Sequence, residues 1–134
     1  MAITKGYQQL IEEAQAKIRT ISLDEAKALH HDTNVIFVDI REIRELERDG
    51  MIPNAIHAPR GMLEFWVDPQ SPYHKEVFSE DKEFVLYCAS AWRSALATLT
   101  LQEMGLASVS HLEGGFSSWK KAGLEIAEKT RRKK

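Results

Sequence analysis

Two short, uninterrupted apolar runs constrain the fold of this chain more than any other feature. They are VIFV at residues 35–38 and FVLY at residues 84–87. A continuous apolar run of this length is expected for a strand buried on both faces, as in a parallel sheet covered by helices. Shorter strands are predicted at residues 19–21, 55–57 and 109–112. Because helical patterns separate these strands, the sequence predicts an α/β domain with a mainly parallel sheet flanked by helices.

The segments between the predicted strands carry start and stop signals of helices. Ser22 followed by Glu25 is a capping-box pattern, which predicts a helix that ends near residue 30. Further helices are predicted at residues 42–49, 92–104 and 116–121. Residues 68–79 contain two prolines and are predicted to form a loop.

An amphipathic pattern marks the N-terminal segment and predicts a helix over residues 7–18. Its apolar face comprises Leu10, Ile11, Ala14 and Ile18. We interpret this helix as packing on its own domain, and the alternative is a surface for a partner or for a homodimer. The chain is thus divided into a helical extension at residues 1–17, one domain at residues 18–127 and a basic tail, predicted to be disordered, at residues 128–134.

Composition narrows the classes of function. At 134 residues the chain is long enough for one domain with a substantial core. Its net charge of −2 creates no overall field that would attract nucleic acid or an acidic membrane. The N-terminus lacks the pattern of a signal peptide, and no apolar run is long enough to span a bilayer. We therefore expect neither a nucleic-acid nor a membrane partner.

The chain contains a single cysteine, Cys88. One cysteine cannot form an internal disulfide, and a reducing compartment suits it, so we expect a cytoplasmic protein. The sequence contains neither a CxxC pair nor a Cys/His cluster at zinc spacing. We therefore expect no metal, no cofactor and no dithiol redox chemistry.

Cys88 lies where a predicted buried strand ends and a helix begins. Backbone N–H groups at a helix start have no intrahelical partner, and the helix dipole favours negative charge there. Both effects stabilise a thiolate, the nucleophilic form of cysteine. Arg93 adds a fixed positive charge at the far end of the loop. Position alone also allows the alternative of an inert, buried cysteine that acts as a small apolar side chain.

Three sequence blocks together resemble the rhodanese-like sulfurtransferase domain. YCASAWRSA at residues 87–95 resembles the family's active-site loop, in which a cysteine, four residues and an arginine follow one another. HLEGGFSSWKKAGLEI at residues 111–126 resembles its C-terminal signature. VIFVDIREIRELERDGMIPNAIHAP at residues 35–59 resembles its Asp-x-Arg strand end followed by an Ile-Pro-x-Ala turn. The blocks occur in the family's order, and the resemblance extends from about residue 18 to residue 126.

The resemblance implies a three-layer rhodanese-like fold and a sulfurtransferase that works through a Cys88 persulfide. A donor such as thiosulfate would supply the sulfur, and an external acceptor, cyanide or a small or protein thiol, would remove it. The loop residues implied to bind substrate are Ala89, Ser90, Ala91, Trp92, Arg93 and Ser94.

Three further residues are assigned supporting roles. Asp39 and Arg41 are implied to support the active-site loop by hydrogen bonds and ion pairing. Arg60 is a candidate for the pocket rim, with a surface salt bridge to Glu64 as the alternative. Ala91 stands where many family members have glycine. Since alanine disfavours positive φ, the loop is expected to be stiffer or slightly altered.

Two other functions remain open from the sequence. A phosphatase or arsenate reductase of the related fold places five residues between its cysteine and arginine, whereas only residues 89–92 intervene here. This smaller loop favours a sulfur atom over a phosphate group. The second alternative is a non-catalytic rhodanese-like binding or scaffold module, although inactive members often lack the cysteine that this chain retains.

Overall fold

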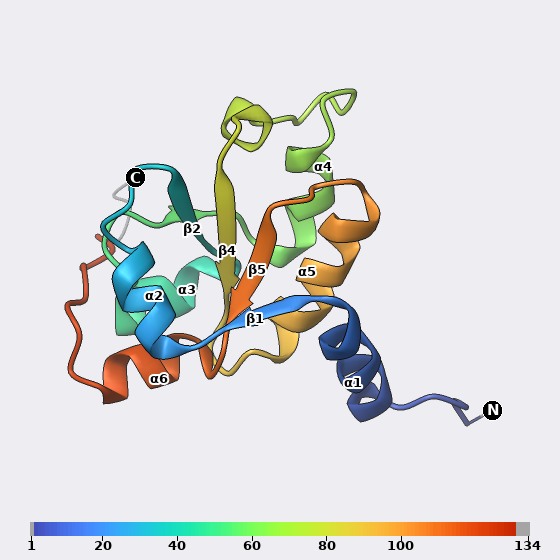
Figure 1. The fold of residues 1–134 in the computed structure, drawn as a ribbon, viewed down its shortest axis with the longest axis horizontal. Helices are drawn as coiled ribbons and strands as arrows, with labels where there is room; N and C mark the ends of the chain where they lie inside the picture. The colour runs from blue at the N-terminus through green and yellow to red at the C-terminus, as the bar shows by residue number, and fades with distance from the viewer. Residues whose placement is uncertain (1, 131–134) are drawn as a thin grey trace.

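A computed structural model describes residues 2–130, so residues 131–134 of the predicted tail lie outside the described residues. Its centre is a five-stranded sheet, all parallel, with the spatial order β1-β5-β4-β2-β3 (Figure 1). The strands are β1 (Arg19–Ile21), β2 (Val35–Asp39), β3 (Ile56–His57), β4 (Glu83–Tyr87) and β5 (Val109–Leu112). The predicted α/β class with a mainly parallel sheet is therefore confirmed, and both apolar runs form inner strands.

Helices cover both faces of the sheet and produce three layers. In Figure 1, α2, α3 and α6 lie on one side, while α4, α5 and α1 lie on the other. The helices are α1 (Tyr7–Lys17), α2 (Leu23–Leu29), α3 (Ile43–Asp49), α4 (Leu63–Val67), α5 (Trp92–Glu103) and α6 (Gly115–Lys121). Two short 3-10 helices are η1 (Arg60–Met62) and η2 (Glu76–Ser79), the second lying within the predicted loop. Among the described residues, no helix is long and apolar enough to cross a membrane.

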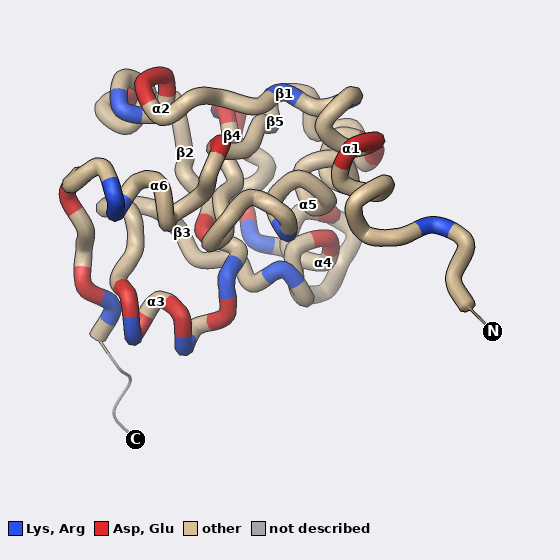
Figure 2. The backbone as a smooth tube through the Cα atoms, turned by 90° about the horizontal axis from the view of Figure 1, so that it is seen from below, with Lys and Arg blue, Asp and Glu red and all other residues tan. Residues whose placement is uncertain are grey.

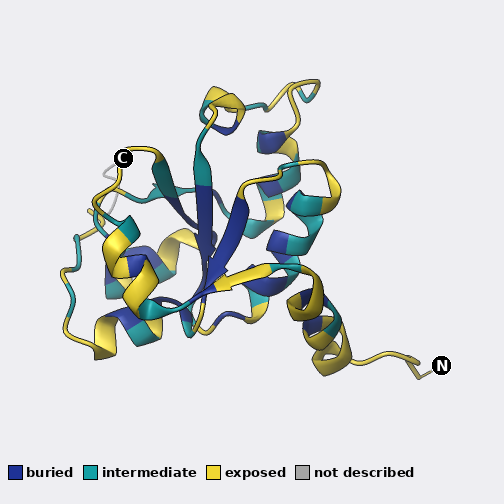
Figure 3. Cartoon of the chain, in the orientation of Figure 1, coloured by how far each residue is buried: buried dark blue, intermediate teal, exposed yellow. Residues whose placement is uncertain are grey.

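The apolar runs supply both halves of the core because side chains alternate across a strand. Phe84 and Leu86 of β4 pack in one apolar cluster with α4 and α5. Val85 and Tyr87 point the other way, into a second cluster with α2 and α6. All four are fully buried, and Figure 3 shows the buried sheet between partly exposed helices. The continuous run is thus explained by burial on both faces.

Local signals account for the predicted helix α2. The Ser22 hydroxyl accepts a hydrogen bond from the Glu25 N–H, and the Glu25 carboxylate accepts one from the Ser22 N–H, both at 3.1 Å. This is the predicted capping box, which satisfies two N–H groups that would otherwise lack partners.

Helix α1 packs against α5 of its own domain. Ile11 and Ala14 are buried against Ala95, and the Gln102 side chain donates a hydrogen bond to the Lys17 carbonyl at 2.9 Å. Leu10, predicted to lie on the packed face, is exposed instead. The apolar face is therefore narrower than the sequence pattern indicated.

The parallel arrangement brings the C-terminal ends of the strands to one edge of the sheet. After β2 the chain adds β3 on one side of that strand, whereas β4 pairs with its other side. In open α/β sheets, ligands bind at the carboxyl ends of strands where the connection reverses direction. Figure 2 views the molecule from this edge and shows acidic and basic residues alternating along α3. Cys88 follows β4 at this reversal.

Candidate active site

The loop between β4 and α5 places Cys88 beneath the start of a helix. Its side chain is buried, with 1% of the residue exposed. The Sγ atom accepts hydrogen bonds from the backbone N–H of Ala91 at 3.2 Å and of Ser94 at 3.4 Å. Two aimed N–H groups and the helix dipole favour negative charge on this sulfur. Two of the loop N–H groups expected around the sulfur are therefore in place.

Ala91 turns the loop so that its N–H faces the sulfur. It immediately precedes α5 and adopts a left-handed conformation, with φ 83° and ψ −3°. A residue with a Cβ adopts this region at a cost of about 1–2 kcal/mol. The alanine thus keeps the backbone shape that glycine would adopt freely, and the strain resides in the loop that holds Cys88.

Arg93 extends away from α5 toward α3. Its guanidinium donates two hydrogen bonds to the Glu45 carboxylate, at 2.8 and 3.0 Å. Hydrogen bonding to Glu45 raises the pKa of Arg93, and the same pair lowers the pKa of Glu45. Glu45 is therefore a partner through which Arg93 can support the loop. The guanidinium is half-exposed, so it also remains open to solvent at the rim of the loop.

Asp39 and Arg41 form a second ion pair, buried at the end of β2, and their side-chain hydrogen bonds go to each other and to Gly50 rather than to the cysteine loop. Arg41 Nε and Nη2 donate to the Asp39 carboxylate at 3.0 and 2.7 Å, and Nη2 also donates to the Gly50 carbonyl at 2.7 Å. Burial opposes the charge of Arg41 more than any other single influence, but hydrogen bonding to Asp39 and the attraction of that carboxylate together leave the pKa of Arg41 raised. The guanidinium carbon lies 4.2 Å from the centre of the Phe116 ring. This pair therefore supports α6 as well as the end of β2.

The start of α6 holds the other side of the loop. Phe116 N–H donates to the Cys88 carbonyl at 2.8 Å, and Ser117 N–H donates to the Ala89 carbonyl at 3.0 Å. Gly115 has a φ of 61°, and a Cβ on it would lie 2.5 Å from the Cys88 carbonyl oxygen. The second glycine of the GG pair is therefore required by this close approach.

A buried polar chain lies behind the loop. His111 on β5 contacts the Ser94 hydroxyl through Nδ1 at 2.9 Å and the Thr20 hydroxyl through Nε2 at 3.0 Å. His111 is fully buried, and burial lowers the pKa of its imidazole to about 4. The ring is therefore neutral at pH 7.

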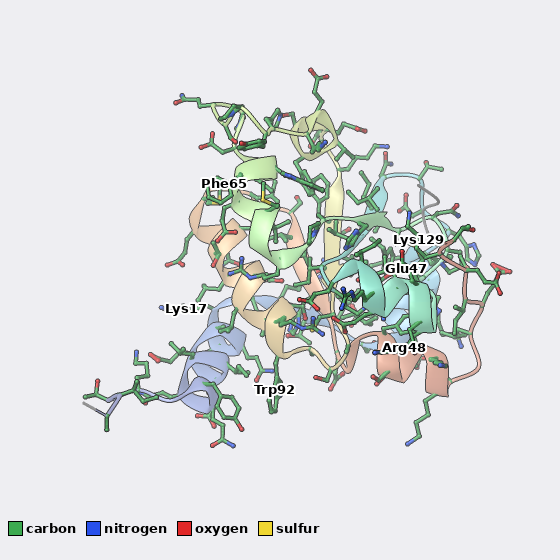
Figure 4. The ribbon with its side chains drawn as sticks, turned by 180° about the vertical axis from the view of Figure 1, so that it is seen from behind. Lys17, Glu47, Arg48, Phe65, Trp92 and Lys129 are labelled. Carbon is green, nitrogen blue, oxygen red and sulfur yellow. The ribbon has the colours of Figure 1, made fainter. Side chains whose placement is uncertain are left out.

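The remaining residues expected at the site do not hydrogen-bond to the Cys88 sulfur. Arg60 pairs with Glu64 at 2.9 Å, so the salt bridge that was the alternative to a role at the pocket rim forms. Trp92 is 55% exposed and lies beside Tyr7 of α1, with ring centres 4.9 Å apart. Figure 4 shows Trp92 pointing outward from the start of α5. Ser90 is exposed at the turn, and Ala89 is half-buried.

Comparison with known proteins identifies the family. The model of the rhodanese-like domain matches residues 22–122, which is most of the chain. The chain belongs to the rhodanese-like domain family. A sulfurtransferase of Allochromatium vinosum is 33% identical to this rhodanese-like chain over 93 residues, covering 69% of the chain and 78% of that protein.

Two solved structures share the rhodanese-like fold. A Rhodopseudomonas palustris protein of unknown function, described as a possible tyrosine phosphatase, is 52% identical. Its TM-score is 0.91, and the match covers 94% of this chain and 97% of that one. The polysulfide-sulfur transferase homodimer of Wolinella succinogenes is 27% identical with a TM-score of 0.69, covering 94% and 90%.

Three residues of this rhodanese-like site were not predicted from the sequence. Glu45, His111 and Thr20 contact the loop residues Arg93 and Ser94 directly or through one another. Glu45 had a usable signal, because an acidic residue in the helix after the Asp-x-Arg strand end faces the same edge of the sheet. The pairing of β1 with β5 brings Thr20 to His111, and this register is not visible in the sequence. No group of three potential metal ligands gathers anywhere in residues 2–130.

Proposed function

We propose that this protein is a sulfurtransferase that carries a sulfane sulfur on Cys88. The observation that supports the proposal most directly is the pair of N–H groups, from Ala91 and Ser94, aimed at the Cys88 sulfur. They stabilise the thiolate form of Cys88, which is the form that attacks the sulfur donor. Membership of the rhodanese-like family and the similarity to a sulfurtransferase agree with this chemistry.

The reaction divides into two displacements. The Cys88 thiolate attacks the outer sulfur of thiosulfate, the sulfur–sulfur bond of the donor breaks, and sulfite leaves with that electron pair. Cys88 then carries a persulfide. An acceptor, cyanide or a thiolate, attacks the outer sulfur, forms thiocyanate or a new persulfide, and regenerates the Cys88 thiolate. Because the chain has one cysteine, the acceptor comes from outside it.

Mass spectrometry of the intact protein after incubation with thiosulfate tests this proposal. We expect a gain of one sulfur atom, reversed by a reductant and absent from Cys88→Ser. A second incubation with a polysulfide tests whether only the donor is wrong. If neither donor adds sulfur to Cys88, the sulfurtransferase proposal fails and the non-catalytic binding module replaces it.

A phosphatase is the second candidate, because the Rhodopseudomonas relative is described as a possible tyrosine phosphatase. The geometry favours sulfur, since four residues separate Cys88 from Arg93 and the guanidinium is engaged by Glu45. Phosphate binding needs a wider loop. We expect no hydrolysis of p-nitrophenyl phosphate that depends on Cys88, and such hydrolysis would favour the phosphatase.

We further propose that the acceptor is a thiol in a reducing, cytoplasmic setting.

We also propose that any homodimer uses α1. Tyr7 and Leu10 leave exposed apolar surface on that helix even though Ile11 packs inward. Light scattering of the wild type and of Leu10→Glu tests the dimer. A wild-type dimer that becomes monomeric on this change supports the use of α1, and a dimer that persists in Leu10→Glu contradicts it.

A further inference from the structure

The polar chain behind the loop reaches from an edge strand to the strained residue of the loop. His111 Nδ1 lies 2.9 Å from Ser94 Oγ, and His111 Nε2 lies 3.0 Å from Thr20 Oγ1. Ser94 Oγ in turn lies 3.3 Å from the carbonyl oxygen of Ala91. Thus β1, β5 and the start of α5 are linked to the residue whose N–H faces the Cys88 sulfur.

The number of available protons selects one arrangement of this chain. A serine hydroxyl has one hydrogen, and a neutral imidazole has one protonated nitrogen. If Ser94 donates to Ala91, its oxygen accepts from His111 Nδ1–H, and Nε2 accepts from Thr20. In the reverse arrangement Ser94 donates to Nδ1, and its oxygen then faces the Ala91 carbonyl oxygen with no proton between them. Only the first arrangement makes all three contacts hydrogen bonds.

We propose that His111 is a positioning residue for the cysteine loop. Its Nδ1–H directs the Ser94 hydroxyl onto the carbonyl of Ala91. This contact holds Ala91 in its left-handed conformation, with its N–H 3.2 Å from the Cys88 sulfur. The inference rests on the proposed function of Cys88 and adds the group that keeps the thiolate-stabilising N–H in place.

The presence of alanine rather than glycine at position 91 explains why such a group is needed. Glycine adopts positive φ freely, whereas a residue with a Cβ needs surrounding contacts to hold it there. Ala91 N–H is one of two donors to the sulfur, so relaxation of φ would remove half of them. His111 itself does not touch the reacting sulfur through any hydrogen bond, so it acts through Ser94 and Ala91.

Two amide variants at position 111 form a matched test. His111→Asn places an N–H donor near the former Nδ1 and keeps the contact with Ser94. The longer side chain of His111→Gln reaches toward Thr20 and loses the contact with Ser94. We measure alkylation of Cys88 by iodoacetamide at pH 7 in the full-length protein. The Gln variant is expected to react about fivefold more slowly, the effect of one ordinary hydrogen bond, and the Asn variant within about twofold of wild type.

A rescue experiment separates positioning from general damage. In the His111→Gln background, Ala91→Gly removes the cost of positive φ. Alkylation should return to within about twofold of the Ala91→Gly single variant, because glycine holds a positive φ without the Ser94 contact. Equal slowing of the Asn and Gln variants, no slowing of either, or no rescue by glycine would overturn the proposal.

Nitrogen NMR of the wild-type imidazole provides an independent outcome if the Gln variant does not fold. We expect the proton on Nδ1, and a proton on Nε2 overturns the proposal. Alkylation reports the reactivity of Cys88 whether or not thiosulfate is a donor. Failed sulfur loading with the expected alkylation pattern therefore rejects the proposed function alone, whereas normal loading with the wrong pattern rejects the role of His111 alone.

Discussion

The cysteine loop has a buried flank and an exposed rim, and each contains an arginine paired with a carboxylate. On the buried flank, Arg41 and Asp39 are 1% and 0% exposed. At the rim, the Arg93 side chain is 40% exposed and pairs with Glu45. The pairs have similar bond lengths but different surroundings. A buried pair has no water to replace a lost partner, whereas a rim charge remains hydrated. We therefore expect the first pair to contribute more to stability, and the second to remain accessible to an anion from solvent.

Removal of the buried carboxylate should have the largest effect. Asp39→Asn leaves Arg41 charged and without its partner in the interior, which is expected to lower the free energy of unfolding by about 3–5 kcal/mol. Urea denaturation at pH 7 measures this loss. Glu64→Gln, which breaks the half-exposed pair with Arg60, is the control and should change stability by less than about 1 kcal/mol. Equal losses in the two variants would contradict the contrast.

Protonation of His111, on the same buried flank, should have the next largest effect on the free energy of unfolding. Its folded pKa of about 4 lies below the unfolded value of 6.5, so the unfolded chain binds the extra proton first. Stability is fully present above pH 6.5 and falls as the pH decreases toward 4. The loss amounts to roughly 3 kcal/mol. Urea titrations between pH 7 and 4 measure it. His111→Asn should lack this component, and an equally steep profile in that variant would contradict the assignment.

Loss of the rim pair should change the KM for the sulfur donor more than it changes the free energy of unfolding. Glu45→Gln removes the charge that engages Arg93, and the half-exposed guanidinium then turns to water. The expected loss of stability is about 1 kcal/mol or less. Because the freed guanidinium can bind an anion, we expect KM for thiosulfate to fall while kcat changes little. Steady-state kinetics with cyanide as acceptor measure both constants. A loss of stability as large as that of Asp39→Asn would show that the rim pair contributes as much to stability as the buried pair, and would contradict the contrast.

The two flanks also differ in how far the sequence predicts them. The buried strands were predicted because four consecutive apolar residues leave few alternatives, and Cys88 was placed at a strand end for the same reason. Asp39 ends β2 and Arg41 lies two residues later, so local sequence alone places the two side chains together at the C-terminal edge of the sheet. Local order in the chain therefore sufficed for these contacts.

Contacts between distant segments were not predictable in this way. The Arg93 contact with Glu45 depends on how α3 and α5, on opposite faces, approach each other at the edge of the sheet, and the Thr20 contact with His111 depends on the register of β1. The exposure of Leu10 shows the same limit, since a helical pattern does not fix which part of an apolar face finds a partner. Each of these outcomes requires the three-dimensional packing of two elements.

The aromatic pair at the rim should have the smallest effect and so sharpens the contrast between the flanks. Tyr7 and Trp92 are both more than half exposed, with ring centres 4.9 Å apart. Tyr7→Leu keeps an apolar side chain but removes the ring, and should lower the free energy of unfolding by about 0.5 kcal/mol. Because Trp92 directly follows the cysteine loop, loss of this contact should loosen the end of the loop, and iodoacetamide should alkylate the variant faster than the wild type. Ile3→Leu, an exposed change away from that pair, serves as the control. Unchanged alkylation in Tyr7→Leu would show that the rim leaves access to the sulfur unaffected, and that the buried flank alone determines its reactivity.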